Sequence, residues 1–143
     1  MSGIFTLTII KPVAFSRNHA VSILKRINEA GYWIVAAKTC QLSPDQAKKF
    51  YAVHEERDFY NDLTEFMSSG PVFVAMLQKE NAVEDFRTLI GKTNPAEAAD
   101  GTIRHDFGTS LRANAIHGSD SDENAIKECN FFFAECDRFY RPG

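Results

Sequence analysis

The chain has 143 residues, of which 44% are hydrophobic and 24% are charged. This length suffices for one substantial core and is too short for two, so we expect a single domain over residues 1–143. The formal net charge of −3 argues against broad affinity for nucleic acids, which requires a basic surface. A phosphate-binding site would therefore have to be built from a few local cations.

The N-terminal apolar stretch is too short for an export signal or a membrane span. It runs from Ile4 to Ile10 and is ended by Lys11. We therefore expect a cytoplasmic protein without a membrane partner. The three cysteines show no Cys-x-x-Cys spacing, which indicates reduced structural thiols rather than a sulfur-based metal site: Cys40, Cys129 and Cys136.

The first third of the chain predicts a strand, a helix and a second strand. Residues 4–10 are rich in β-branched side chains, as in a buried strand. The next segment has apolar residues at helical spacing and should end at Gly31, with residues 32–40 returning as a strand. The expected buried stripe of this helix contains Val21, Leu24, Ile27 and Ile23.

Two further helices show capping-box patterns at their starts. Ser43 with Gln46 begins one helix, which reaches Tyr51, and Asn81 with Glu84 begins another. Between them lie a short helix around Leu63, Phe66 and Met67 and a buried strand over residues 71–77. The apolar face of the helix after Asn81 consists of Val83, Phe86, Leu89 and Ile90.

The last third contains a long loop, a short helix or turn, a brief strand and a final helix. The loop spans residues 91–101, and loops of this length are often functional. Either Ser119 or Ser121 caps the final helix, whose buried side should contain Ala125, Ile126, Cys129, Phe132 and Phe133. The element order predicts an α+β fold of the ferredoxin-like type, a β-α-β-β-α-β sandwich with a four-stranded antiparallel sheet and added helices.

Residues 114–121 read Asn-Ala-Ile-His-Gly-Ser-Asp-Ser and are the most informative segment. Gly118 leaves backbone room beside His117, so that a group as large as a phosphate could reach the imidazole. The alternative is an ordinary histidine at a strand end beside a turn.

Phosphoryl transfer needs several cationic donors that converge on one phosphate chain. Lys11, Arg87 and Arg104 are the candidates, and Thr93 adds a hydroxyl donor. No P-loop pattern is present, so distant segments must assemble the site. Arg87 lies at the edge of a buried stripe, where it either meets an anion or is an ordinary surface arginine.

Four separated motifs occur in one order: Lys11-Pro12, Thr93-Asn94-Pro95, residues 101–104 and residues 114–121. With these motifs the chain resembles the nucleoside diphosphate kinase family from about Phe5 to Phe133. The resemblance implies the ferredoxin-like fold and a ping-pong reaction in which His117 takes the γ-phosphate of a nucleoside triphosphate and passes it to a nucleoside diphosphate.

The resemblance also implies how a nucleotide is bound. Lys11, Arg87, Thr93 and Arg104 match the phosphate-binding positions, and Asn114 with Lys11 matches the ribose contacts. Phe59 matches the aromatic residue that stacks on the base, with Leu63 and Leu111 on the opposite face. From the residues alone, a core phenylalanine in an apolar run is the favoured interpretation of Phe59.

Four further residues match those that complete the family's site. Glu128 matches the glutamate that orients the imidazole, and Tyr51 matches a residue that helps to hold it, although a tyrosine on a helix surface is the alternative. Ser119 and Asp120 match the serine and the acid of the site, and both also suit a helix cap.

The resemblance further implies Mg²⁺, nucleotide substrates and self-assembly. Mg²⁺ should bridge the nucleotide phosphates, with a water-mediated contact to Asp120 and no dedicated protein cage. Family members form tetramers or hexamers from a shared dimer, and the sequence does not choose between them.

Departures from the family pattern occur at Val13, His54 and Asp58, and His54 is placed to modulate binding. The alternative function is a nucleotide-binding regulator or scaffold without turnover, and the joint presence of the site residues favours catalysis.

Overall fold

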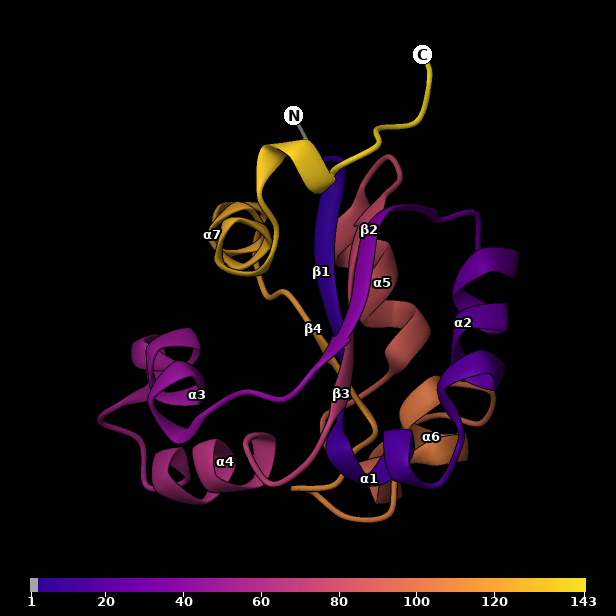
Figure 1. Cartoon of the computed structure of the whole chain (residues 1–143). Coiled ribbons are helices and arrows are strands. Elements are labelled where there is room, and N and C mark those ends of the chain that lie inside the picture. Colours follow the sequence, from indigo (N-terminus) through magenta and orange to yellow (C-terminus); the bar gives the residue numbers. More distant parts are fainter. Residues whose placement is uncertain (1–2) are drawn as a thin grey trace.

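A computed structural model describes residues 3–143, and its four strands form one antiparallel sheet in the order β2-β3-β1-β4. The central pair is β1 with β3, and β2 and β4 lie at the edges (Figure 1). The strands are β1 (Phe5–Ile10), β2 (Trp33–Cys40), β3 (Val72–Gln78) and β4 (Ile116–Gly118). This topology confirms the expected ferredoxin-like α+β fold.

Helices cover both faces of the sheet (Figure 1). The helices are α1 (Pro12–Ser16), α2 (Ala20–Glu29), α3 (Pro44–Phe50), α4 (Tyr60–Met67), α5 (Ala82–Ile90), α6 (Ile103–Phe107) and α7 (Asp122–Phe132). Three short 3₁₀ turns complete the elements: η1 (Ala52–His54), η2 (Pro95–Glu97) and η3 (Glu135–Asp137). None of the helices in residues 3–143 is long and apolar enough to cross a membrane.

Two apolar clusters lie on opposite faces of the sheet. Along β3, Val74 and Met76 pack with α3, α4 and α7, whereas Ala75 and Leu77 pack with α2, α5 and α6. This separation follows from the alternation of side chains along a strand. The short strand β4 is fixed against β1, where His117 is the partner of Ile9.

Several expected helix starts and ends are confirmed, and one is wrong. Ser43 and Gln46 form the capping box at α3, and Gly31 follows α2 with a φ of 95°. Asn81 does not form a capping box, because its backbone is left-handed and its side chain donates a hydrogen bond to Asp85.

Two expected core residues are exposed. Val21 is 75% exposed and Ile126 is 56% exposed. With about 3.6 residues per turn, Val21 lies far around α2 from the buried Ile23 and Ile27. Ile126 likewise lies about 100° around α7 from the buried Ala125, so both predictions of burial were wrong.

Candidate functional site

Strand β4 and helix α7 bring His117 and Glu128 together. The Nε2 atom of His117 lies 2.8 Å from Oε1 of Glu128, and the histidine side chain is only 15% exposed. Within residues 3–143, Nδ1 of His117 has no hydrogen-bond partner. Because the Glu128 carboxylate accepts a hydrogen bond from Nε2–H, the lone pair of the neutral ring lies on Nδ1, which is left free to react.

Ser119 connects Glu128 to the central strand. The buried hydroxyl accepts a hydrogen bond from the backbone N–H of Leu7 (3.0 Å) and donates one to Oε1 of Glu128 (2.8 Å). Glu128 is thus held by two donors, Ser119 and His117. Ser119 is therefore a member of the site and not a helix cap, because Ser121 caps α7 by accepting from the N–H of Asn124.

Asp120 lies at the edge of this arrangement. Its side chain is exposed, and Oδ1 accepts a hydrogen bond from Asn124 at 2.6 Å. This contact suits its alternative interpretation as a residue that supports the start of α7. The second carboxylate oxygen has no protein donor within residues 3–143 and remains open to water.

Aromatic rings surround the imidazole on the side of α3. The ring of Tyr51 meets that of His117 edge to face at a centroid distance of 6.0 Å. The Tyr51 hydroxyl is buried and has no partner within residues 3–143. Burial, and secondarily Glu128, raises the pKa of Tyr51 above its usual range, so the phenol stays protonated and its O–H remains an available donor.

Lys11 is a buried cation without a carboxylate partner among the described residues. It is 6% exposed, and its Nζ donates to Oδ1 of Asn114 at 2.8 Å. Burial, and secondarily Arg104, lowers the pKa of Lys11 to about 7. The Asn114 amide in turn donates to the backbone oxygen of Thr93 at 2.9 Å. Three distant segments therefore meet at Asn114.

Arg104 is held by backbone carbonyls beside the histidine strand. Its guanidinium donates to the oxygen of Gly91 (3.0 Å) and to that of Ile116 (2.9 Å), the residue before His117. Burial, and secondarily Arg87, lowers the pKa of Arg104 to about 10. The arginine remains charged at neutral pH, and the adjacent cations leave this region in need of an anion.

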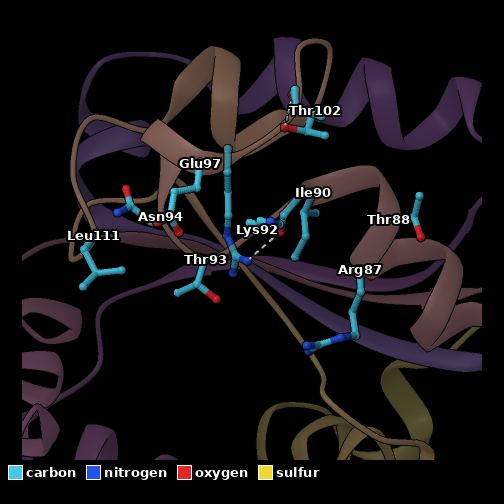
Figure 2. Close-up of a pocket in the computed structure, with 12 residues that line it drawn as sticks. Arg87, Thr88, Ile90, Lys92, Thr93, Asn94, Glu97, Thr102 and Leu111 are labelled. Carbon is cyan, nitrogen blue, oxygen red and sulfur yellow. Dashed lines mark hydrogen bonds between the residues drawn. The ribbon is translucent and has the colours of Figure 1, made fainter.

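A cavity of about 910 Å³ adjoins these groups and is large enough for a nucleotide. Arg87, Thr93, Arg104 and Leu111 line it, and Figure 2 shows Leu111 at the opposite side from Thr88 and Arg87. His117, Lys11 and Asn114 are not part of the lining, but two lining residues connect to them. Arg104 donates to the carbonyl of Ile116, the residue before His117, and the carbonyl of Thr93 accepts from Asn114, which in turn accepts from Lys11. Arg87 is exposed and lines this cavity.

The expected base-binding residues are only partly brought together. Phe59 is 49% exposed, so its interpretation as a core phenylalanine is wrong, and its ring lies 5.5 Å from that of His54. Leu111 is exposed and lines the cavity. Leu63 is instead partly buried against the core cluster and does not line the cavity.

Gly118 has a role that the sequence interpretation missed. A Cβ at this position would lie 2.9 Å from Cδ2 of Phe86 and 3.0 Å from Cδ1 of Ile90. Helix α5 therefore fills the space that we expected to admit a ligand. Glycine is needed at this position so that β4 can pack closely against α5.

Two other residues near the site were not anticipated. Phe50 packs against the His117 ring, and Lys92 adds a cation to the cavity lining. Phe50 reads as one more apolar residue of α3, and its position beside Tyr51 was the only available signal.

The fold and the site together have the arrangement that phosphoryl transfer to a histidine would require. An oriented imidazole with a free nitrogen lies beside cations that can bind a phosphate chain.

Comparison with known proteins gives the particular family. The family model described as nucleoside diphosphate kinase matches residues 5–138. The chain is 60% identical over 129 residues to a nucleoside diphosphate kinase of Campylobacter curvus, covering 90% of this chain and 94% of that protein. It is 54% identical over 134 residues to that of Flavobacterium psychrophilum, covering 94% and 96% of the two chains.

Solved structures agree with this result. The nucleoside diphosphate kinase of Aquifex aeolicus superposes with a TM-score of 0.94 at 42% identity, covering 95% of this chain and 99% of the other. That of Halobacterium salinarum, in complex with CDP, gives 0.92 at 32% identity, covering 97% and 93%. The chain belongs to the nucleoside diphosphate kinase family, and it is an enzyme with that activity.

Proposed function

We propose that this enzyme transfers the γ-phosphate between nucleotides through a phosphohistidine on Nδ1 of His117. The observation that carries the proposal is the hydrogen bond from Nε2 to Glu128, which leaves Nδ1 as the free nucleophilic atom. A neutral imidazole is itself nucleophilic. A separate general base is not required.

The reaction divides into two displacements. In the first, the Nδ1 lone pair forms a bond to the γ-phosphorus, the bond from that phosphorus to the β,γ-bridging oxygen breaks, and the nucleoside diphosphate leaves. In the second, a β-phosphate oxygen of another nucleoside diphosphate takes the phosphoryl group from Nδ1. Lys11, Arg87 and Arg104 stabilise the phosphate charge in both steps, and Glu128 stabilises the cationic ring.

We propose the substrate contacts from the match to the family. Arg87, Thr93 and Arg104 bind the phosphates, and Lys11 with Asn114 contacts the ribose hydroxyls. Exposed Phe59 stacks on the base, and exposed Leu111 packs on its other face. Stacking addresses the π-face of a base rather than its edge, so base selectivity should be weak.

Mg²⁺ fits this site as an ion that arrives with the nucleotide. When bound, it supplies charge neutralisation for the phosphate oxygens. Within residues 3–143 no three His, Cys, Asp or Glu side chains cluster as metal ligands. We assign the open oxygen of Asp120 to a water-mediated contact with the ion.

The chain also suits self-assembly, and we propose a homo-oligomer, tetramer or hexamer, built from dimers. Support comes from exposed apolar side chains on α2 and the edge strand β2, namely Val21, Trp33 and Ile34. Light scattering should give a multiple of the chain mass of 16.1 kDa. A monomer at micromolar concentration contradicts this assembly.

Labelling with γ-³²P-ATP tests the catalytic proposal. The expected product is an acid-labile, base-stable phosphoprotein that GDP discharges, and His117→Ala should abolish the label while ADP still binds. A wild-type protein that binds ADP without acquiring the label would instead support the alternative of a regulator or scaffold.

A further inference from the structure

The imidazole of His117 is enclosed by an aromatic residue that the proposed chemistry does not use. The ring of Phe50, the last residue of α3, lies 5.4 Å from that of His117 at an interplanar angle of 69°. This edge-to-face arrangement is one that aromatic pairs prefer.

Phe50 is itself fixed by rings from α3 and α7. Its centroid lies 4.8 Å from that of Tyr51, 5.4 Å from that of Phe131 and 5.2 Å from that of Phe132. Phe131 and Phe132 end the helix that also carries Glu128. The contact with His117 is therefore part of a packed group in which the ring has little freedom to move.

The histidine needs such a contact because a single hydrogen bond does not fix a planar ring. The bond to Glu128 anchors the ring at Nε2, and the imidazole can still swing about that anchor. Terminal torsions of this kind have broad energy wells. Flat side chains packed against the ring restrict this rotation and keep Nδ1 pointing in one direction.

We propose that Phe50 is a positioning residue for phosphoryl transfer, which holds the plane of the His117 imidazole so that Nδ1 points at the incoming phosphorus. This inference rests on the proposed role of His117. None of the ring contacts of Phe50 is with a residue that we assign to nucleotide binding, so its effect should fall on the transfer step and not on nucleotide binding. A small misplacement of a reacting atom is enough to slow a reaction strongly.

Two measurements test the inference. Rapid-quench kinetics give the rate of His117 phosphorylation at saturating γ-³²P-ATP, and calorimetry gives the affinity for ADP. Phe50→Leu should slow phosphorylation about tenfold and leave the Kd for ADP within about twofold. Phe50→Tyr, which keeps the flat ring, should restore the wild-type rate. Phe131→Leu is the matched control, because Phe131 touches Phe50 without a ring contact to His117, and it should slow phosphorylation by much less than Phe50→Leu does.

The inference is overturned if Phe50→Leu phosphorylates at the wild-type rate, or if Phe131→Leu loses as much. It is also overturned if ADP affinity falls in parallel with the rate, since that outcome indicates general distortion. If Phe50→Leu does not fold, Phe50→Met is used in its place, because methionine also lacks a flat ring. The same criteria then apply to Phe50→Met. A wild-type protein that binds ADP without labelling refutes the proposed function itself, which separates the two failures.

Discussion

At the scale of single residues, the carboxylate of Glu128 is the group that distinguishes the two nitrogens of His117. Glu128→Gln keeps the size of the side chain and removes the charge that stabilises the cationic ring during transfer. We expect His117 phosphorylation to slow about a hundredfold, with ADP affinity nearly unchanged. Rapid-quench kinetics would measure this, with Ser119→Ala as the milder comparison because Glu128 then keeps its bond to His117. Equal rates for wild type and Glu128→Gln would count against an electrostatic role.

Lys11 makes nucleotide binding depend on pH. Its pKa of about 7 means that the free enzyme loses this charge as the pH rises through that value, whereas a bound phosphate chain favours the charged form. The affinity for ADP should therefore fall up to about tenfold per unit above pH 7. Calorimetry between pH 6.5 and 9 would measure the slope, and Lys11→Met should bind weakly with a flat profile. A flat wild-type profile would show that Lys11 titrates near its ordinary value.

At the scale of elements, the contact between β4 and α5 depends on Gly118. Gly118→Ala places a methyl group against Phe86, and we expect it to lower the free energy of unfolding by about 1–3 kcal/mol. Gly70→Ala is a suitable control, because its Cβ would lie at an ordinary 3.8 Å from Pro12. Urea unfolding would compare the free energies of unfolding of the two variants. Equal values would mean that α5 moves aside for the methyl group without loss of stability.

The order and type of the elements could be predicted from the sequence, but the details at their faces could not. Ser43 formed its capping box because serine, proline and glutamine all favour the same helix start. The capping box predicted at Asn81 does not form, because asparagine tolerates the left-handed backbone conformation and its side chain then does not cap α5. Val21 and Ile126 were misplaced because each adjoins an apolar neighbour on the same helix, and periodicity alone does not choose between them.

At the scale of the whole molecule, one sheet supports both apolar clusters, and we propose that the chain is a single cooperative domain. Met76→Ala in one cluster and Leu77→Ala in the other should each cost about 2–5 kcal/mol. Unfolding should remain a single transition by circular dichroism and by the fluorescence of Trp33, the only tryptophan. Two transitions in either variant would separate the clusters into independent units.

The assembly of the site belongs to this same scale and marks the limit of residue patterns. Spacing alone does not reveal that Lys11, Thr93 and Asn114 are joined by hydrogen bonds, because only the tertiary fold brings those segments together. The resemblance to a family identified the candidate site residues, and the structure shows which residues they hydrogen-bond. The pairing of His117 with Glu128 was expected from the family resemblance, whereas the contact between Phe50 and His117 was recognised only from the structure.

The hydrogen bond from the Leu7 backbone to Ser119 has a consequence for any attempt to move this chemistry elsewhere. A peptide that copied residues 114–121 would contain the histidine but neither the carboxylate of α7 nor the strand that fixes the serine beside it. Grafting the segment onto another scaffold would therefore yield an imidazole that no carboxylate orients. To keep His117, Glu128 and Ser119 in contact, β1, β4 and α7 would have to be moved together.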